Sequence, residues 1–308
     1  RQMCIRDSKM ARLCEGRVAL VTGAARGVAR EHALGLAKHG AKVVVNDLGA
    51  GVDGSGADTT PAQAVVDEIK ALGGEAIVNG DDVSSWTGAK NMIDQTIDAF
   101  GTIDVVVNNA GILRDRMLVN MTEDEWDAVI QVHLKGTFAP SRHAAAYWRQ
   151  LSKDRGEKVN ARIINTSSTS GLYGNIGQTN YGAAKAGIAA FTIIAARELA
   201  RIGVTVNAIS PTAYTRMTDN LREYTEEDIE RRDPRWVSPT IVYLSSAEAH
   251  DITGRVIQAG NGRVAVCEGW RRGAEIDQIE DAEAIGPMIR DMISNVRKNS
   301  GMDGLELD

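Results

Sequence analysis

The chain has 308 residues, of which 43% are apolar and 25% are charged, and its formal net charge is −6. This composition excludes a disordered, collagen-like or histone-like chain. Basic residues are scattered along the sequence and give no electrostatic signature of nucleic-acid binding. The longest nearly apolar stretch, at 188–196, is about half as long as a membrane span. We therefore expect a cytoplasmic protein with no nucleic-acid or membrane partner.

The three cysteines form no recognisable site. Cys4, Cys14 and Cys267 are far apart in the sequence and include no CxxC pair. An odd number of isolated cysteines argues against a disulfide framework and against a zinc site, and it favours a reducing compartment. No metal site is predicted.

The first nine residues differ from the rest of the chain. Residues 1–9 have neither the apolar segment nor the small-residue cleavage site of a signal peptide, and their pattern shares no periodicity with the residues after them. We expect natural translation to begin at Met10 and the preceding residues to be an artefact of expression or assembly.

Short β-branched runs alternate with longer periodic segments from Arg17 onward. The runs are nearly all apolar on both faces, which is typical of parallel strands covered by helices. Seven strands are predicted, at 18–22, 42–46, 75–79, 103–108, 161–166, 204–210 and 255–260. Helices are predicted at about 28–39, 61–72, 87–100, 123–150, 179–201 and 238–247. This alternation predicts an α/β fold, a doubly wound parallel sheet of the Rossmann type with right-handed crossovers.

No boundary divides the alternating region into two units, so we expect one domain over 10–262. The Gly-rich stretch at 49–57 is predicted to be a surface loop at a strand end. Residues 263–308 are expected to form a polar C-terminal extension with one helix at about 281–298.

A glycine turn follows the first predicted strand. In VTGAARGVA (21–29), Gly23 and Gly27 lack Cβ atoms, so a pyrophosphate can approach the backbone and the start of the next helix. A Gly-rich turn without a ligand is the alternative. Asp47, directly after the second strand, is suited to accept hydrogen bonds from a ribose 2′-hydroxyl and to repel a 2′-phosphate. Arg26, a basic side chain in the turn, favours the 2′-phosphate of NADP. We give Asp47 more weight and expect NAD rather than NADP.

A second group of residues lies past the middle of the chain, at 167–187. Tyr181 and Lys185 are four residues apart at the start of a predicted helix, and Ser168 follows the fifth strand. A tyrosine that works as an acid or base near neutrality needs its pKa lowered by about three units, which takes about 4 kcal/mol. A nearby ammonium and an oxidised nicotinamide would supply that stabilisation. A helix that carries Tyr and Lys by coincidence is the alternative.

These residues resemble the short-chain dehydrogenase/reductase family from about Gly16 to Gly262. The motifs that carry the resemblance occur in the family's order, namely TGAARGVA (22–29), DV (82–83), NNAG (108–111), the Ser168, Tyr181 and Lys185 set, and SPTAYTRM (210–217). The resemblance implies that Tyr181 is the general acid/base, that Ser168 hydrogen-bonds the same substrate oxygen, and that Lys185 lowers the tyrosine pKa and holds the nicotinamide ribose. It also implies a set of cofactor-binding residues, namely Gly23, Arg26, Gly27, Val28, Asp47, Asp82, Val83, Asn108, Asn109, Ala110, Gly111, Tyr181, Lys185 and Pro211.

Two positions depart from the family pattern. Ala29 stands where the family has a third glycine, and His133 stands where most members have an asparagine of a proton relay. A histidine there is either a packed residue or a proton carrier, because its usual pKa is near neutrality. His133 is therefore added to the expected catalytic residues.

His133 also indicates a subgroup. The segments 43–49, 105–116, 132–138 and 166–181 resemble the dehydrogenase part of the D-specific multifunctional enzymes of peroxisomal β-oxidation and their stand-alone bacterial relatives. The resemblance implies interconversion of (3R)-3-hydroxyacyl-CoA and 3-oxoacyl-CoA with NAD. The loop at 111–116 and the segment at 212–232, predicted to be a helical lid, are candidate substrate contacts.

Other functions remain open on the sequence alone. The same chemistry could serve an acyl-carrier-protein substrate, a steroid or another secondary alcohol, and a non-catalytic NAD-binding module is an alternative of another class. The helices at 123–150 and 179–201 carry many small apolar residues, and family resemblance implies that they pair in a homodimer or homotetramer.

Overall fold

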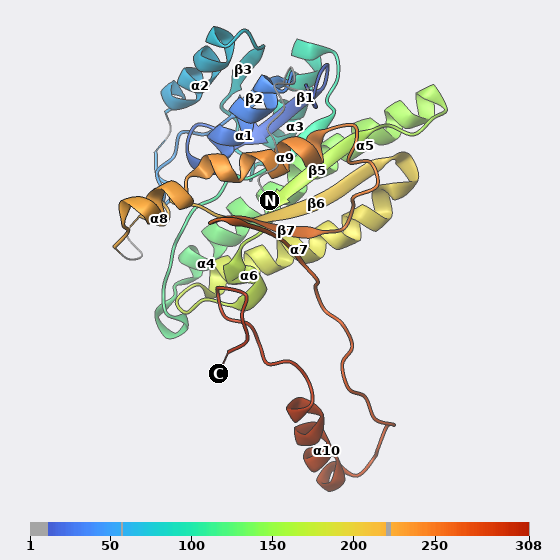
Figure 1. The fold of residues 1–308 in the computed structure, drawn as a ribbon. Helices are drawn as coiled ribbons and strands as arrows, with labels where there is room; N and C mark the ends of the chain where they lie inside the picture. The colour runs from blue at the N-terminus through green and yellow to red at the C-terminus, as the bar shows by residue number, and fades with distance from the viewer. Residues whose placement is uncertain (1–11, 57, 220–222, 308) are drawn as a thin grey trace, which may run out of the picture.

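One open sheet of eight strands forms the centre of the protein (Figure 1). The computed structural model describes residues 12–56, 58–219 and 223–307, so the expected leader at 1–9 and Met10 lie outside the described residues. The strand order is β3-β2-β1-β4-β5-β6-β7-β8, and every neighbouring pair is parallel except β7 and β8. The strands are β1 (Val18–Thr22), β2 (Lys42–Asn46), β3 (Ala76–Asn79), β4 (Val105–Asn108), β5 (Ala161–Thr166), β6 (Val204–Thr212), β7 (Val256–Gly260) and β8 (Arg263–Cys267). The predicted Rossmann-type α/β fold is confirmed.

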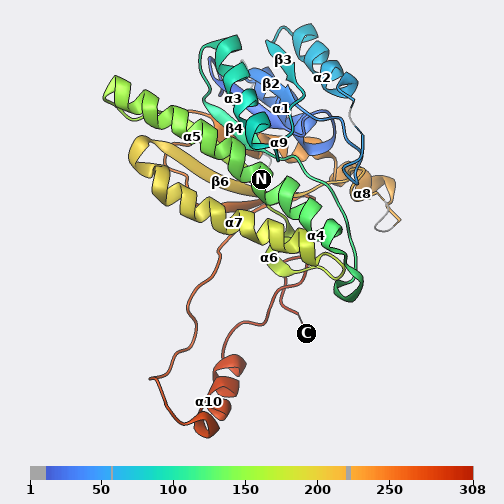
Figure 2. The same ribbon diagram turned by 180° about the vertical axis from the view of Figure 1, so that it is seen from behind.

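Helices cover both faces of the sheet, as the opposite views in Figures 1 and 2 show. One hydrophobic core lies between the sheet and α1 (Gly27–Lys38), α2 (Thr60–Ala71) and α9 (Ser238–Ser245). The second core lies under α3 (Trp86–Phe100), α5 (Gly136–Arg155) and α7 (Thr179–Leu199). The shorter helices are α4 (Glu123–Ile130), α6 (Thr169–Tyr173) and α8 (Glu226–Arg231). Because both faces are covered, β1 and β5 are buried at every position, which explains their unbroken apolar runs.

The strand order reverses at β1. The chain moves outward from β1 through β2 to β3, and then returns to place β4 on the other side of β1. In open α/β sheets, ligands bind outside the carboxyl ends of the strands at such a reversal. The loops that follow β1, β2, β4 and β5 therefore frame the crevice of interest.

The eighth strand is a correction to the expected sheet, whose last strand was predicted at 255–260. Strand β8 pairs antiparallel with β7 through a tight turn at Asn261 and Gly262, whose φ angles are +52° and +75°. Asn-Gly with both φ angles positive is the preferred two-residue hairpin turn. The strand was missed because four of its five residues are exposed, so it lacks the apolar run that identified the others.

The single helix predicted at 123–150 is divided in two. A π-helical turn, Gln131–Lys135, separates α4 from α5, and α5 continues to Arg155 although Pro140 lies inside it. A π turn inserts an extra residue into the helical repeat and is often found at functional sites. Here it carries His133.

The rest of the C-terminal extension leaves the sheet. Helix α10 (Ala282–Ser294) lies apart from the other helices in Figures 1 and 2, near the predicted 281–298. The chain then returns, and a Cβ on Gly304 would lie 3.6 Å from the hydroxyl of Tyr173 in α6. Within the described ranges, no helix has the length and apolarity needed to cross a membrane. The same residues contain no cluster of three or more His, Cys, Asp or Glu side chains able to hold a metal ion.

Candidate active site

The glycine turn after β1 packs tightly against the loop after β4. Gly23 and Gly27 have φ angles of +67° and +58°, and a Cβ on Gly23 would lie 2.8 Å from Cα of Ala110. The Thr22 hydroxyl accepts hydrogen bonds from the backbone N–H groups of Asn109 (3.0 Å) and Ala110 (3.2 Å). These contacts require glycine at position 23 and hold the two loops side by side at the edge of the crevice.

The start of α1 is suited to bind an anion. Its N-cap residue, Arg26, makes no side-chain cap, so the first N–H groups of the helix are not satisfied by that side chain. Together with the helix dipole, these groups favour a phosphate. Hydrogen bonds from Thr60 lower the pKa of the Asp58 carboxyl, and the charge of Arg26 lowers it further. The expected dinucleotide turn therefore has a backbone that fits a pyrophosphate.

Asp47 lies beside this turn, as the sequence predicted. Its Oδ2 accepts a hydrogen bond from the backbone N–H of Ala25 (3.0 Å), and its Oδ1 accepts one from Gly49 (2.7 Å). The two bonds fix the carboxylate at the carboxyl end of β2, and each oxygen keeps a lone pair for a further donor. An acidic acceptor next to a phosphate-binding turn fits a ribose hydroxyl.

The other expected cofactor residues lie in the turn after β3, in α1, near the end of β6 and in the loop after β4. Asp82 Oδ1 accepts hydrogen bonds from the N–H and the hydroxyl of Ser84, so it shapes the turn after β3, and Val83 is buried beside it. Val28 packs against the core beneath α1, and Pro211 lies near the end of β6. Asn109, Ala110 and Gly111 are partly exposed and line the loop after β4.

Asn108 does not line the crevice, which corrects the expectation for the first residue of the NNAG motif. Its side chain is buried and its amide donates hydrogen bonds to Ser141 Oγ (2.8 Å) and Asn165 Oδ1 (2.9 Å). The alternation of side chains along a strand turns Asn108 inward and leaves Asn109 at the edge. Asn108 therefore joins β4 to α5 and β5.

Ser168, Tyr181 and Lys185 meet at the carboxyl end of β5. Ser168 caps α6, where its hydroxyl accepts a hydrogen bond from the backbone N–H of Ser170 (3.2 Å), and this hydroxyl is close enough to the Tyr181 phenol to lower the phenol's pKa. Tyr181 lies in the first turn of α7 and Lys185 one turn later, with Nζ 5.5 Å from the centre of the tyrosine ring. Lys185 Nζ also donates a hydrogen bond to the carbonyl of Thr166 (2.7 Å), the last residue of β5. The spacing in the sequence predicted this cluster, and the structure brings it together.

The proton affinities in this cluster differ from the expectation. Burial raises the pKa of Tyr181 to about 12, while the Ser168 hydrogen bond acts in the opposite direction and the charge of Asp115 raises it further. Burial lowers the pKa of Lys185 to about 7. The predicted lowering of the tyrosine pKa by Lys185 is therefore outweighed by desolvation, and the lysine itself titrates near neutrality.

His133 lies beside Tyr181 and is uncharged at neutral pH. The two rings meet edge to face with centres 5.1 Å apart. Burial and the charge of Lys185 lower the pKa of His133 to about 3, so the expected pKa near neutrality is wrong. Nε2 contacts the backbone of Ile112, whereas Nδ1 is buried and has no hydrogen-bond partner among the described residues. His133 therefore remains a neutral group with one unused ring nitrogen facing no described partner.

The glycine at position 111 makes room for this histidine. A Cβ on Gly111 would lie 2.2 Å from Cε1 of His133. No side chain fits there, so the last residue of the NNAG motif is required to be glycine by the packing of the histidine.

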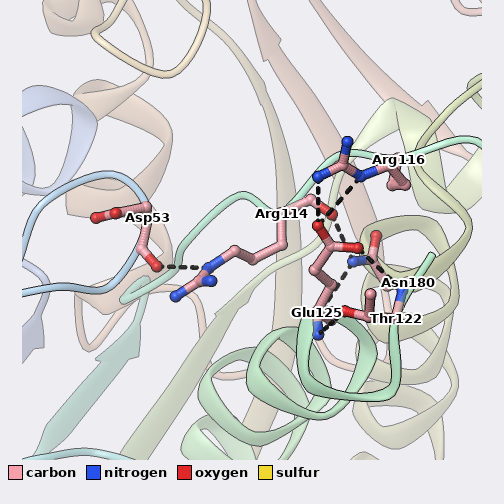
Figure 3. A network of polar contacts seen from close by, with 6 residues as sticks. All are labelled: Asp53, Arg114, Arg116, Thr122, Glu125 and Asn180. Carbon is pink, nitrogen blue, oxygen red and sulfur yellow. Dashed lines mark hydrogen bonds and ion pairs between the residues drawn. The ribbon is translucent and has the colours of Figure 1, made fainter. Parts of the chain in front are cut away.

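Two further contacts could not be predicted from motifs. The Gly-rich loop after β2 reaches the loop after β4, where the Val52 carbonyl accepts a hydrogen bond from Leu113 N–H (3.0 Å) and the Asp53 carbonyl accepts one from Arg114 Nε (2.7 Å). Figure 3 shows the Arg114 side chain extended toward Asp53. Since β2 and β4 flank β1, this loop crosses the carboxyl end of β1.

The second contact involves Gln178, which precedes α7. Its side chain accepts a hydrogen bond from Ser170 Oγ and donates one to Asp115 Oδ2, each at 2.7 Å. The loop after β4 is thereby joined to α6, whose N-cap is Ser168. Partial burial raises the pKa of the Asp115 carboxyl.

The segment predicted to be a helical lid, at 212–232, is helical only near its end. Helix α8 begins at Glu226, and residues 220–222 lie outside the described ranges. Earlier in the segment, Thr215 approaches the glycine turn, since a Cβ on Gly27 would lie 3.5 Å from Cγ2 of Thr215. The segment therefore borders the same crevice.

Comparisons with known proteins agree with this geometry. The family model described as short chain dehydrogenase matches residues 17–228. The chain is 46% identical over 250 residues to hydroxyacyl-CoA dehydrogenase ChsB1 of Mycobacterium tuberculosis, covering 78% of this chain and 76% of that protein. It is 42% identical over 285 residues to peroxisomal multifunctional enzyme type 2 of Drosophila melanogaster, covering 92% of this chain but 45% of that longer protein. A crystal structure of a short chain dehydrogenase from Mycobacterium avium is 48% identical, with a TM-score of 0.84, and the match covers 96% of this chain and 100% of that one.

Proposed function

Because the chain belongs to the short-chain dehydrogenase/reductase family, whose members are oxidoreductases that use a nicotinamide cofactor, we propose that it interconverts (3R)-3-hydroxyacyl-CoA and 3-oxoacyl-CoA with NAD. The observation that carries the chemistry is the meeting of Ser168, Tyr181 and Lys185 at the carboxyl end of β5. The substrate class is supported by similarity to proteins named hydroxyacyl-CoA dehydrogenase and peroxisomal multifunctional enzyme.

The cofactor preference follows from Asp47. A carboxylate held beside the glycine turn by Ala25 N–H accepts hydrogen bonds from a ribose 2′-hydroxyl and repels a 2′-phosphate. The start of α1 and Gly23 would hold the pyrophosphate, and Lys185 would hold the nicotinamide ribose. When bound in its oxidised form, the nicotinamide ring supplies an acceptor for the hydride and a positive charge that favours the tyrosine phenolate.

The protein's own groups move the proton. Tyr181 removes the proton from the substrate hydroxyl, and Ser168 donates a hydrogen bond to the same oxygen as it becomes a carbonyl. In the reverse direction the phenol returns that proton. His133, which is neutral, contributes packing against the tyrosine ring and an unprotonated nitrogen.

Ionisation of the Tyr181 phenol takes more free energy than the charge of Lys185 supplies. Lowering the pKa of Tyr181 from about 12 to about 7 takes about 7 kcal/mol. One positive charge at the 5.5 Å that separates Lys185 Nζ from the ring centre supplies about 3 kcal/mol at an effective dielectric constant of about 20. Lys185 alone is therefore insufficient, and a second positive charge of similar effect is needed. The positive charge of the oxidised nicotinamide would therefore assist proton removal by Tyr181.

The direct test is an absorbance assay for NADH. We expect NADH to form when the protein is incubated with NAD and a (3R)-3-hydroxyacyl-CoA, and not with the (3S) enantiomer. The Tyr181→Phe variant should lose nearly all turnover while binding NAD as the wild type does, because it lacks only the exchangeable proton. Turnover by this variant at the wild-type rate would overturn the assignment of Tyr181.

Asp47→Ala tests the cofactor proposal separately. Removing the carboxylate should shift the ratio of kcat/KM for NAD to that for NADP toward NADP by about tenfold or more. Asp58→Ala is the matched control, since this exposed carboxyl lies near Arg26. An unchanged ratio in Asp47→Ala would contradict the proposed role.

One alternative substrate has an observation in its favour. The chain is 41% identical over 252 residues to 3-oxoacyl-[acyl-carrier-protein] reductase FabG of Staphylococcus aureus. Oxidation of NADPH with a 3-oxoacyl-carrier protein, at a kcat/KM above that for the CoA thioester with NADH, would select this alternative.

We also infer a homodimer or homotetramer. Large apolar side chains of α5 and α7 are exposed, namely Phe138, Ile193 and Ile194, and exposed apolar surface of this kind is typical of association sites. Light scattering should give a mass of two or four chains, and a monomeric mass at micromolar concentration would refute the inference.

A further inference from the structure

The loop after β4 runs alongside the start of α7, and backbone contacts join the two. Arg116 N–H donates a hydrogen bond to the Gly177 carbonyl (2.8 Å), and Arg116 forms an isolated parallel bridge with Gln178. The Arg116 guanidinium also makes two hydrogen bonds, at 2.7 and 3.1 Å, to one carboxylate oxygen of Glu125 in α4. Loop, α4 and α7 therefore meet at one point, which is shown in Figure 3.

Asn180 lies at the centre of this meeting point and is completely buried. Its side-chain Nδ2 donates hydrogen bonds to the carbonyls of Arg114 (2.9 Å) and Glu125 (3.1 Å). Its Oδ1 accepts a hydrogen bond from the backbone N–H of Tyr181 (2.7 Å). The one amide thus contacts the loop after β4, the first turn of α4 and the residue that carries the reactive phenol.

The chemistry of these contacts explains why asparagine stands there. Two carbonyl oxygens need donors and one N–H needs an acceptor, and a primary amide offers both. An aspartate would place a carboxylate against two carbonyls, and an aliphatic side chain would remove all three hydrogen bonds. The arrangement is therefore specific for an amide of this length.

The positions of Tyr181 and Ser168 both depend on the loop after β4. Tyr181 follows Asn180 directly, and its phenol must meet the hydroxyl of Ser168, which caps α6. The backbone of Tyr181 is held on one side by Asn180, while Gln178 joins Asp115 of the loop to Ser170 of α6. The loop after β4 thus holds both Tyr181 and Ser168 in position relative to each other.

We propose that Asn180 is a positioning residue that sets the distance between the Tyr181 phenol and Ser168 by fastening the first turn of α7 to the loop after β4 and to α4. This inference rests on the proposed function of Tyr181 as the acid/base. It assigns no contact between Asn180 and substrate or cofactor.

Several charged or titratable groups face the phenol and must be considered with it. They are Lys185 on α7, Asp115 on the loop after β4 and His133 on the π turn. The Ser168 hydrogen bond lowers the pKa of Tyr181. Loss of Asn180 should weaken that bond, so the apparent pKa that governs kcat should rise.

The test compares Asn180→Ala and Asn180→Ser with the wild type, using the secondary alcohol that gives turnover. In Asn180→Ala we expect kcat to fall by about tenfold or more, KM for NAD to change less than about twofold, and the apparent pKa of the kcat profile to move upward. Asn180→Ser keeps one donor and one acceptor, so its kcat should lie between those of the alanine variant and the wild type. Thr179→Ala is the control, because Thr179 is exposed in the same helical turn.

Three results would overturn the proposal. The first is an unchanged kcat and pH profile in Asn180→Ala. The second is a fall in kcat matched by an equal loss of NAD affinity, with no movement of the pH profile. The third is failure of both Asn180 variants to fold, which would make the role of Asn180 purely structural. Tyr181→Phe separates this proposal from the one on which it rests. If that variant keeps wild-type turnover, the acid/base assignment has failed, whatever Asn180→Ala does.

Discussion

Arg162 and Lys185 are both buried cations, and they lie at opposite ends of strand β5. Arg162 is the second residue of the strand and is 1% exposed, while Lys185 is 3% exposed and donates to the carbonyl of Thr166, the last residue of the strand. Burial disfavours the charged form of both groups. Their partners, however, are very different.

Each side-chain nitrogen of Arg162 has a hydrogen-bond acceptor, whereas Lys185 has fewer acceptors than N–H bonds among the described residues. All three nitrogens of the Arg162 guanidinium donate to carbonyls, those of Ala161 (2.9 Å), Ser246 (3.1 Å) and Ala247 (3.1 Å). Burial and the nearby charge of Arg17 lower the pKa of Arg162 to about 10, so it stays protonated at neutral pH. Lys185 has one acceptor for three N–H bonds among the described residues, and its pKa is about 7.

This difference separates a structural cation, Arg162, from Lys185, which we propose to be part of the active site. Arg162 donates hydrogen bonds to the carbonyls that follow the end of α9. It does so at the amino-terminal end of β5, whereas the crevice lies at the carboxyl end. Lys185 has donors left over beside Tyr181, at the edge where ligands bind. Burial and charge are shared by the two sites, and the supply of acceptors distinguishes them.

The largest effect is expected from Lys185→Met. This change removes the cation beside Tyr181, so kcat should fall by about a hundredfold to ten-thousandfold, while the free energy of unfolding at pH 7 should not decrease, because the cost of burying that charge is removed with it. The measurement is steady-state kinetics together with urea denaturation. Lys90→Met, which removes a surface lysine paired with Asp94, is the control and should keep wild-type kcat. A functional Lys185→Met enzyme would remove the distinction between the two cations.

Arg162→Met should have the opposite profile. It removes the guanidinium donors from two carbonyls that follow α9, those of Ser246 and Ala247, and from the carbonyl of Ala161 in β5, and we expect a loss of about 3 kcal/mol in the free energy of unfolding. Urea denaturation gives this value, and kcat per folded molecule should be unchanged because β5 still delivers Thr166 to the crevice. A fall in kcat with unchanged stability would show that the two ends of the strand are coupled.

The sequence predicted the buried part of the fold well and the exposed part poorly. Strands such as β1 and β5 have the predicted bounds because burial on both faces demands an unbroken apolar run. Strand β8 has no such run, and only the Asn261–Gly262 pair signalled the hairpin. The π turn left no signal in the apolar periodicity that was read as one helix.

The site shows the same division. Tyr181 and Lys185 could be found from their spacing on one helix, and Ser168 from its place after a strand. Asn180 could not, because its partners are backbone carbonyls and an N–H from three segments that only folding brings together. The low pKa of His133 was also hidden, since it depends on burial rather than on residue type.

The smallest expected effect is the part of the pH dependence of stability that Lys185 contributes. Its pKa is about 7 in the folded protein against 10.5 for an unperturbed lysine, so between these values the unfolded chain holds one more proton than the folded protein. Stability then rises with pH, by at most about 1.4 kcal/mol per pH unit, whereas below pH 7 the cost of the buried charge is present in full. Urea denaturation at pH 6, 7.5 and 9 should therefore show the wild type gaining stability relative to Lys185→Met as the pH increases.

Arg162→Met provides the matched comparison for this pH series. Because the pKa of Arg162 is about 10, the residue stays protonated in both states through most of this range, and its contribution should be nearly constant from pH 6 to 9. Groups whose pKa depends on neither substituted residue, such as Cys14, titrate alike in these proteins and cancel in each difference from the wild type. A flat difference for Lys185→Met would mean that the folded protein keeps this lysine charged, as it does Arg162. In that case the shortage of acceptors around Lys185 would not lower its proton affinity. Arg162 and Lys185 would then differ only in which end of β5 they lie at.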